Sequence, residues 1–228
     1  MSFILAIDGP AGSGKGTITK KLAEKLDLIN IDTGAMYRCV ALFAIENNVE
    51  SNDIEKIQEL LNKISIDMKI EGKKQKIILN GKDVTDEIRT TRVDDCVAKY
   101  AAVKCVREKM VSLQREMGQN KNIIMEGRDI GTVVFPEADI KIYLDATLEE
   151  RANRRYKQDI EKGMNVTYEE ILEGIKQRHK LETERAISPL KKAEDAIYVD
   201  STNLTINEVV DKIIEIVNSK GGQDEKVF

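Results

Sequence analysis

A glycine-rich loop near the amino terminus carries the clearest chemistry in this sequence. The apolar run Phe3–Asp8 leads into Gly-Pro-Ala-Gly-Ser-Gly-Lys-Gly-Thr. Backbone N–H groups in such a loop converge on a phosphate, and the helix that follows presents its positive end to the same anion. Lys15 is placed to reach the outer phosphates as a point charge. The pattern predicts a nucleoside triphosphate site, made of Gly9, Pro10, Ala11, Gly12, Ser13, Gly14, Lys15, Gly16 and Thr17.

The residue after the lysine narrows the class of nucleotide-binding protein. A standard P-loop has Ser or Thr there, and its hydroxyl binds Mg²⁺. Here the position is Gly16, and a hydroxyl follows one residue later on Thr17. Switch GTPases and motor ATPases need that direct metal ligand, so Gly16 counts against them. The loop instead resembles that of the nucleoside monophosphate kinases, in which Mg²⁺ arrives with ATP.

A second cluster follows the apolar run Leu28–Asp32. Open parallel sheets bind ligands at the carboxyl ends of their strands. Gly34 permits close approach of a ligand, and Arg38 lies one helical turn further on, where it suits an anion. Taken alone, the segment is equally well explained as a helix start with a solvated arginine. Beside a P-loop it predicts the site of a second phosphate-bearing substrate, formed by Asp32, Thr33, Gly34 and Arg38.

The segment Glu126–Thr132 repeats this pattern after another apolar strand. Glu126 is placed to influence Mg²⁺ through water, with no direct protein ligand to the metal expected. Arg128 suits a phosphate, and Asp129 suits a hydrogen-bond donor. A turn closed by a salt bridge is the alternative interpretation.

Arginines also gather in the last third of the chain, at helical spacings: Arg151, Arg154, Arg155, Arg178 and Arg185. Glu150 and Arg154 could form an ordinary surface pair. Like charges on one helical face reduce stability, however, so the clustered arginines indicate a binding site for an anionic ligand. In phosphoryl transfer, mobile arginines that close over the moving group stabilise its charge. We therefore expect residues 148–185 to form a mobile helical lid.

Alternating strands and helices must position these groups. Short apolar runs predict strands at 3–8, 28–32, 122–125, 140–145 and 196–200. Three helix starts carry the pattern of a capping box: Thr147 with Glu150, Thr167 with Glu170, and Thr205 with Glu208. Five strands that alternate with helices predict an α/β fold, with a parallel sheet covered on both faces.

One region departs from this alternation. Residues 64–85 contain alternating apolar and polar positions, then a turn at 71–74 and the tight-turn pair Asn80-Gly81. We expect a small antiparallel β subdomain inserted into a single domain that spans 1–228. The polar end of the chain, 220–228, is expected to be a disordered tail.

Composition excludes several classes of function. Charged residues make up 33% of the chain but nearly balance, with a formal net charge of −4, so nothing favours nucleic-acid binding. No apolar stretch approaches a membrane span. The amino terminus shows no export signal, and three cysteines without metal-type spacing suggest reduced thiols in a cytoplasmic protein. A single histidine, His179, argues against a histidine triad or a zinc site. Nothing demands more than a monomer.

Together these motifs resemble those of the bacterial cytidylate kinases, from the P-loop almost to the end of the last helix. The resemblance rests on the loop, on Asp-Thr-Gly-Ala-Met-Tyr-Arg, on Glu-Gly-Arg-Asp-Ile-Gly-Thr-Val-Val-Phe-Pro and on Arg-Ala-Ile-Ser-Pro-Leu. It implies a P-loop kinase fold that transfers phosphate from ATP to CMP or dCMP, with Mg²⁺.

The resemblance also implies roles for particular residues. Lys15 would hold the transferring phosphate, and Arg38 and Arg128 the acceptor's monophosphate. Arg107 and Asp129 would read cytosine. Glu182 would bond the ribose hydroxyls. The closing lid would be formed or flanked by Arg151, Arg154, Arg155, Arg178 and Arg185.

The sequence departs from the family pattern at a few positions. Ala98 stands where the family usually has serine, and Lys104 where it has proline. The usual Arg-Asp-x-x-Asp-x-x-Arg becomes Arg178-His179-x-x-Glu182-x-x-Arg185. Glu182 has one methylene more than the aspartate usual in the family, and this difference affects the expected preference between ribose and deoxyribose acceptors.

Two other functions remain open from the sequence. One is a kinase of the same fold that acts on another acceptor, such as UMP, AMP, GMP or shikimate. The other is a nucleotide-binding sensor without turnover. Gly16 and the arginines count against a switch.

Overall fold

The computed structural model describes residues 2–71 and 74–221. It forms two compact units, one made of residues 1–30 and 118–228 and the other of residues 31–117. Each is described by itself.

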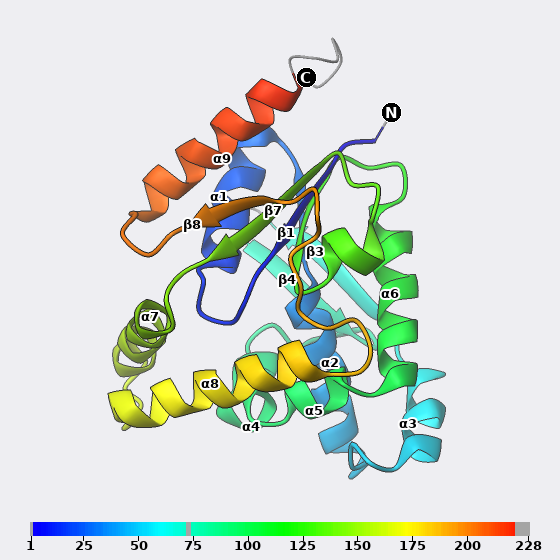
Figure 1. The fold of residues 1–228 in the computed structure, drawn as a ribbon. Coiled ribbons are helices and arrows are strands. Elements are labelled where there is room, and N and C mark those ends of the chain that lie inside the picture. The colour runs from blue at the N-terminus through cyan, green and yellow to red at the C-terminus, as the bar shows by residue number, and fades with distance from the viewer. Residues whose placement is uncertain (1, 72–73, 222–228) are drawn as a thin grey trace. The chain divides into compact units, whose positions relative to one another are not determined.

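The first unit is built on a parallel sheet (Figure 1). Its strands follow the order β2-β6-β1-β7-β8, so the strand that leads into the P-loop lies at the centre. Leu5 of β1 pairs with Ile124 on one side and Ile140 on the other. The central strands are apolar and buried along most of their length, as expected where both faces are covered. The strand bounds are β1 Ile4–Asp8, β2 Ile29–Asp32, β6 Ile123–Gly127, β7 Ile140–Asp145 and β8 Ile197–Asp200.

Two helices, α1 (Lys15–Leu26) and α9 (Ile206–Gly221), lie side by side along this sheet (Figure 1). Their apolar positions pack with those of the strands in one core, in which Leu22 and Ile213 are fully buried. This packing fixes the direction of α1, and with it the position of the P-loop at its start. The five predicted strands are thus confirmed, each within two residues at its ends.

A pair of helices, α7 (Leu148–Glu161) and α8 (Tyr168–Glu184), follows β7. The predicted capping boxes at Thr167 and Thr205 are present, with both reciprocal hydrogen bonds. The one at Thr147 is only half formed. Its hydroxyl accepts from the N–H of Glu150, but the Glu150 carboxylate instead binds Arg154. The N–H of Thr147, which the predicted box would pair with Glu150, donates to Thr202 Oγ at 3.0 Å instead.

The second unit has its own core, made of apolar residues from its helices and a small antiparallel sheet, β3-β4-β5. Asn80 and Gly81 both have positive φ, 49° and 84°, as the predicted tight turn requires. Of the turn predicted at 71–74, Glu71 is the last residue of β3 and Lys74 the first of β4, and residues 72–73 lie outside the described part. The bounds are α2 Thr33–Glu46, α3 Ile54–Leu61, β3 Ile66–Glu71, β4 Lys74–Leu79, β5 Lys82–Asp83, α4 Thr91–Asp94, α5 Val97–Ala101 and α6 Lys104–Gly118.

The last helix continues into the segment expected to be a disordered tail. Helix α9 runs to Gly221, so residues 220 and 221 are helical, and residues 222–228 lie outside the described part. Among the helices of the described residues, none combines the length and apolar character that crossing a bilayer requires.

Candidate active site

The P-loop turns through two glycines with left-handed backbone. Gly12 has a φ of 80° and Gly14 a φ of 89°, conformations that cost little only when there is no Cβ. Gly14 is also the N-cap of α1, so the helix begins directly at the loop, and the Gly14 carbonyl accepts from the N–H groups of Thr17 and Ile18. This is the backbone geometry that phosphate-binding loops use.

Lys15 lies inside this loop and is 6% exposed. Its Nζ donates to the Pro10 carbonyl at 2.7 Å and to Ser13 Oγ at 3.3 Å. Burial and, second to it, the charge of Arg128 lower the pKa of the Lys15 ammonium from 10.5 to about 7, although the carboxylates of Glu126, Glu182 and Asp8 act in the opposite direction. An ammonium so destabilised gains strongly from a nearby anion.

The start of α7 packs directly against the P-loop. Arg151 donates from Nε to the Ala146 carbonyl at 3.1 Å and from a terminal nitrogen to the Ala11 carbonyl at 3.2 Å. A Cβ on Gly12 would lie 2.9 Å from the carbonyl oxygen of Arg151. Gly12 is therefore needed both for its positive φ and for this close approach.

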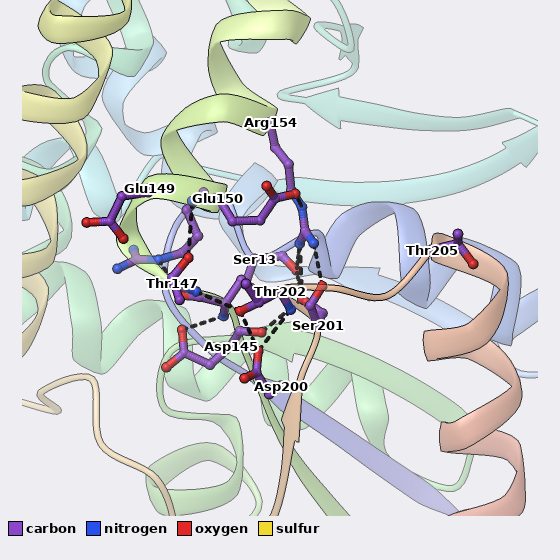
Figure 2. A network of polar contacts seen from close by, with 12 residues as sticks. Ser13, Asp145, Thr147, Glu149, Glu150, Arg154, Asp200, Ser201, Thr202 and Thr205 are labelled. Carbon is purple, nitrogen blue, oxygen red and sulfur yellow. Dashed lines mark hydrogen bonds and ion pairs between the residues drawn. The ribbon is translucent and has the colours of Figure 1, made fainter.

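Arg154 joins the P-loop to the loop after β8 (Figure 2). Its Nε binds Glu150 Oε1 at 2.8 Å, and one terminal nitrogen donates to the Ser13 carbonyl at 3.3 Å. Both terminal nitrogens also donate to Ser201, to Oγ at 3.0 Å and to the carbonyl at 2.6 Å. Ser201 is itself buried and donates from Oγ to the Asp145 carbonyl. Arg154 thus fixes the backbone of the P-loop.

A cavity of about 370 Å³ lies beside this network, lined by Thr147, Glu149, Glu150, Asn153, Tyr168, Thr202 and Asn203. This lining carries two carboxylates and no cation, which does not suit a phosphate group. The P-loop, with the buried Lys15 ammonium, suits an anion better.

The segment after β6 is held in place by the end of β1. Both carboxylate oxygens of Asp8 accept backbone hydrogen bonds at 2.8 Å, from the N–H groups of Ile130 and Gly131. Burial raises the pKa of Asp8 to about 6, although these two hydrogen bonds act in the opposite direction. Asp8 therefore fixes the turn that presents Arg128 and Asp129.

Glu182, on α8, lies between two arginines. Its Oε1 accepts from Arg178 Nε at 3.0 Å, and its Oε2 lies 2.9 Å from Arg128 Nε in an ion pair. Burial of Glu182 raises the pKa of its carboxyl, but the charges of Arg128 and Arg178 outweigh this and hold the pKa at about 2. The carboxylate is ionised at any physiological pH.

Asp129 and Arg185 form a second buried pair, with 3.7 Å between Oδ1 and a terminal nitrogen. The Nε of Arg185 also donates to the Ser188 carbonyl at 2.6 Å. Arg185 is the residue after the end of α8 and has an extended backbone. The prediction that it shares a helical face with Arg178 is therefore wrong, because the helix ends one residue earlier.

In the second unit, the predicted residues at the end of β2 gather around α2. The Asp32 carboxylate caps this helix by accepting from the N–H of Ala35 at 3.0 Å, and it pairs with Arg89 at 3.3 Å. Arg38 pairs with Asp94 at 2.6 Å. Thr33 is buried in the first turn of α2, and a Cβ on Gly34 would lie 3.1 Å from Asp32 Oδ1.

Arg107 is the largest fully buried side chain of this unit. It is 1% exposed, and its guanidinium lies over the ring of Tyr37, 5.2 Å from the centroid. One terminal nitrogen donates to the Ala101 carbonyl at 3.3 Å. Of the two nearby departures from the family pattern, Ala98 lies half-buried in α5, and Lys104 is the exposed first residue of α6, a position that also suits proline.

Glu126 lies at the junction of β6 and the P-loop helix. Its Oε1 accepts from the Thr19 hydroxyl at 3.2 Å, and a Cβ on Gly16 would lie 3.3 Å from the same oxygen. Buried carboxylate oxygens are donors that suit Mg²⁺. The residues present therefore fit a magnesium ion carried with ATP.

The α7 arginines already have partners in this structure, contrary to the expectation from like charges. Arg154 pairs with Glu150, and Arg155 Nε with the buried Asp159 at 2.8 Å. The pair of Glu150 and Arg154 weighed as an alternative is present. The role of these arginines at the phosphates stays a prediction.

Several residues around the site were missed from the sequence. Asp8 and Ser201 each end or follow a parallel strand, so the strand-end rule applied to Asp32 and Glu126 would have found them. Asp94 and Asp159, by contrast, carry no such signal, because an acidic residue on a helix is ordinarily solvated.

Comparisons with known proteins agree with one another. The sequence profile of the cytidylate kinase family matches residues 5–219. The chain is 49% identical over 212 residues to the cytidylate kinase of Fusobacterium nucleatum, covering 93% of this chain and 95% of that one. It is 48% identical over 216 residues to the cytidylate kinase of Bacillus subtilis, covering 95% and 96%. An uncharacterized protein from Eubacterium ventriosum has the same fold, with a TM-score of 0.55, 14% identity and coverage of 96% and 99%.

Proposed function

Because this chain belongs to the cytidylate kinase family, we propose that it transfers the γ-phosphoryl group of ATP to CMP and dCMP, giving ADP and CDP or dCDP. The observation that carries this proposal is the buried Lys15 inside a glycine-rich loop, with its pKa lowered to about 7. Such a group is stabilised when the phosphates of ATP arrive beside it.

At the phosphate end, residues 9–17 cradle ATP and Lys15 neutralises charge that builds on the outer phosphates. Arg151 and Arg154 hold the P-loop in shape through its carbonyl groups. Arg155 and Arg178 lie further along the helical pair and act on the transferring group. All four stabilise the transition state, two of them through the loop that they fix.

At the acceptor end, Arg38 and Arg128 bind the monophosphate, with Asp32, Thr33 and Gly34 shaping the site around it. Asp129 accepts from the N4 amine of cytosine, and Arg107 donates to N3 or O2. Uracil has a carbonyl where cytosine has that amine, so Asp129 favours CMP over UMP. Arg185 holds Asp129 in place, since the two lie 3.7 Å apart.

Magnesium enters with ATP. Glu126 would hold it through water, and when bound the ion neutralises charge on the outer phosphates. The protein's own part is to keep the Glu126 carboxylate ionised beside the first turn of α1, where Thr19 donates to it.

We assign residues 148–185 as a lid and residues 64–85 as an inserted subdomain that shapes the acceptor site, both within one kinase domain that acts as a monomer. The three cysteines are free, which suits a reducing compartment such as the cytoplasm.

A coupled assay of ADP release tests the proposal, with CMP, dCMP, UMP, AMP, GMP and shikimate as acceptors. We expect CMP and dCMP to be the best acceptors, UMP weaker and the purine nucleotides poor. Preference for another acceptor would identify a different small-molecule kinase. ATP binding without turnover on any acceptor would indicate a sensor.

A further inference from the structure

Lys141 is a buried lysine in the parallel sheet of the first unit. It lies on β7 opposite Ala6 of β1 and is 8% exposed. Lysine is almost never buried to this extent unless its charge is paired. Here the ammonium donates to the Pro136 carbonyl and pairs with the Asp195 carboxylate at 2.7 Å. Neither partner takes part in the mechanism proposed above, so the reason for this buried charge lies elsewhere.

The segment that follows β6 forms a short π-helical turn, Ile130–Val134. The carbonyl of Asp129 accepts from the N–H groups of Val133 and Val134, at 2.9 and 3.2 Å, and the Phe135 N–H closes the turn on the Ile130 carbonyl at 2.7 Å. Turns of this kind are rare and are found mostly at functional sites. The backbone of Asp129 is therefore fixed by the turn that it begins.

Lys141 supports this turn at two points. Its ammonium binds the carbonyl of Pro136, just beyond the end of the π-helix. Its stem passes Gly131, where a Cβ would lie 3.1 Å from Cδ and 3.3 Å from Cγ of Lys141. The Gly131 N–H is also one of the two that Asp8 accepts from. Asp8 thus fixes the beginning of the turn, and Lys141 supports its middle and its end.

Resting on the proposed function, we infer that Lys141 is a positioning residue, which holds the turn 130–134 so that the Asp129 carboxylate meets the N4 amine of cytosine. It acts on the base through the backbone of the turn, without contacting the substrate. A shift of that carboxylate weakens the contact that separates CMP from UMP. Loss of the Lys141 ammonium therefore reduces the preference for cytosine and leaves ATP binding intact.

The test is Lys141→Met, which keeps an unbranched apolar stem and removes the ammonium from the Pro136 carbonyl. We expect the KM for CMP to rise about tenfold, the effect of losing one hydrogen bond to a charged group. The ratio of kcat/KM between CMP and UMP should fall severalfold, and the KM for ATP should be unchanged. Lys141→Arg, which restores a cation that can donate, should recover part of the preference for CMP.

Asp195→Ala is the matched control. It removes the other partner of the Lys141 ammonium and leaves the contact with Pro136 in place. The Asp195 side chain is 65% exposed, and ion pairs open to solvent contribute little. This variant should keep both the wild-type KM for CMP and the wild-type preference over UMP.

Gly131→Ala tests the same contact from the side of the turn. Its Cβ would lie 3.1 Å from Lys141 Cδ, tighter than most such contacts in proteins, so we expect the preference for CMP to fall. The ammonium and both of its partners remain, so the result is readable whatever Lys141→Met does to stability. In a double-mutant cycle with Lys141→Ala, which clears the space beside Gly131, the double variant should lose less than the product of the two single losses.

Four results would overturn the inference: a wild-type preference for CMP in folded Lys141→Met or in Gly131→Ala, losses that multiply in the cycle, a parallel rise in the KM for ATP, or the same loss in Asp195→Ala. The third would indicate a general structural defect, and the fourth would mean that Lys141 acts through the segment before β8. If the wild-type chain instead prefers another acceptor, the proposed function is wrong. The KM values of Lys141→Met for that acceptor and for ATP then still decide whether Lys141 positions the turn.

Discussion

At the scale of single residues, the positive side-chain charge inside the P-loop comes from Lys15. We expect Lys15→Ala to lower turnover by about a hundredfold or more, as the loss of one preorganised electrostatic group commonly does. Steady-state assays of purified protein would measure this. Lys25→Ala is the control, because Lys25 lies on the same helix and its pair with Asp211 is exposed. Near-normal turnover in Lys15→Ala would contradict the assignment of the P-loop.

The lowered pKa of Lys15 gives a prediction of its own. With a pKa of about 7, Lys15 is mostly neutral at pH 8, and the phosphates of ATP raise that pKa again. Binding of a non-hydrolysable ATP analogue at pH 8 should therefore take up about one proton, and less at pH 6. Calorimetry in two buffers of different ionisation enthalpy measures the uptake. Lys15→Met should abolish it, and uptake that is absent in the wild type would be inconsistent with a buried Lys15.

At the scale of elements, the contact between α7 and the P-loop depends on Gly12. Gly12→Ala would strain a φ of 80° and press a methyl group to 2.9 Å from the Arg151 carbonyl oxygen. We expect it to destabilise the protein by about 1–3 kcal/mol and to weaken ATP binding. Gly174→Ala, in the middle of α8 with nothing within 4 Å, is the matched control and should stabilise by about 0.5–1 kcal/mol. Equal effects at both positions would show that the close packing does not matter.

The contact between α7 and the P-loop also narrows the segment that we expect to move as a lid. The start of α7 is already bonded to the P-loop through Arg151 and Arg154, so closure should involve the part of the helical pair beyond them. Hydrogen exchange with and without a bisubstrate analogue should show new protection mainly over residues 155–178, with less change over 148–154. Unchanged exchange over 155–178 under saturating ligand would remove the lid.

Local sequence patterns predicted the helices and strands well, but they predicted the contacts between these elements poorly. The strands, the P-loop and the Asn80-Gly81 turn follow from short apolar runs and from residues that tolerate positive φ. The order of the strands and the pairing of Arg128 with Glu182 depend on residues far apart in the chain, for which a single sequence carries no local signal. The end of α8 before Arg185 was missed for a related reason: the Glu182 carbonyl in its last turn accepts from the N–H of Leu190, eight residues further on, at 2.7 Å.

At the scale of the whole molecule, the ion pairs of Glu182 make stability depend on pH. The pKa of its carboxyl falls from 4.5 to about 2 on folding, so the ionised form stabilises the folded state above about pH 4.5 and loses that effect as pH falls toward 2. The unfolding free energy of the wild type should exceed that of Glu182→Gln at pH 7, and the difference should shrink between pH 4.5 and 2. Urea titrations at several pH values measure this difference in unfolding free energy. A difference that stays constant with pH would mean that the ion pairs of the Glu182 carboxylate do not stabilise the folded state.

The close approach of Gly16 to Glu126 also constrains how this loop can change over evolutionary time. A serine at position 16 would supply the hydroxyl of a standard P-loop, but its Cβ would lie 3.3 Å from Glu126 Oε1, tighter than most such contacts in proteins. The Glu126 carboxylate would therefore have to shift by a few tenths of an ångström, away from the position in which it accepts from the Thr19 hydroxyl. We therefore expect the effect of Gly16→Ser to depend on which residue stands at position 126, so that the two positions change together in evolution.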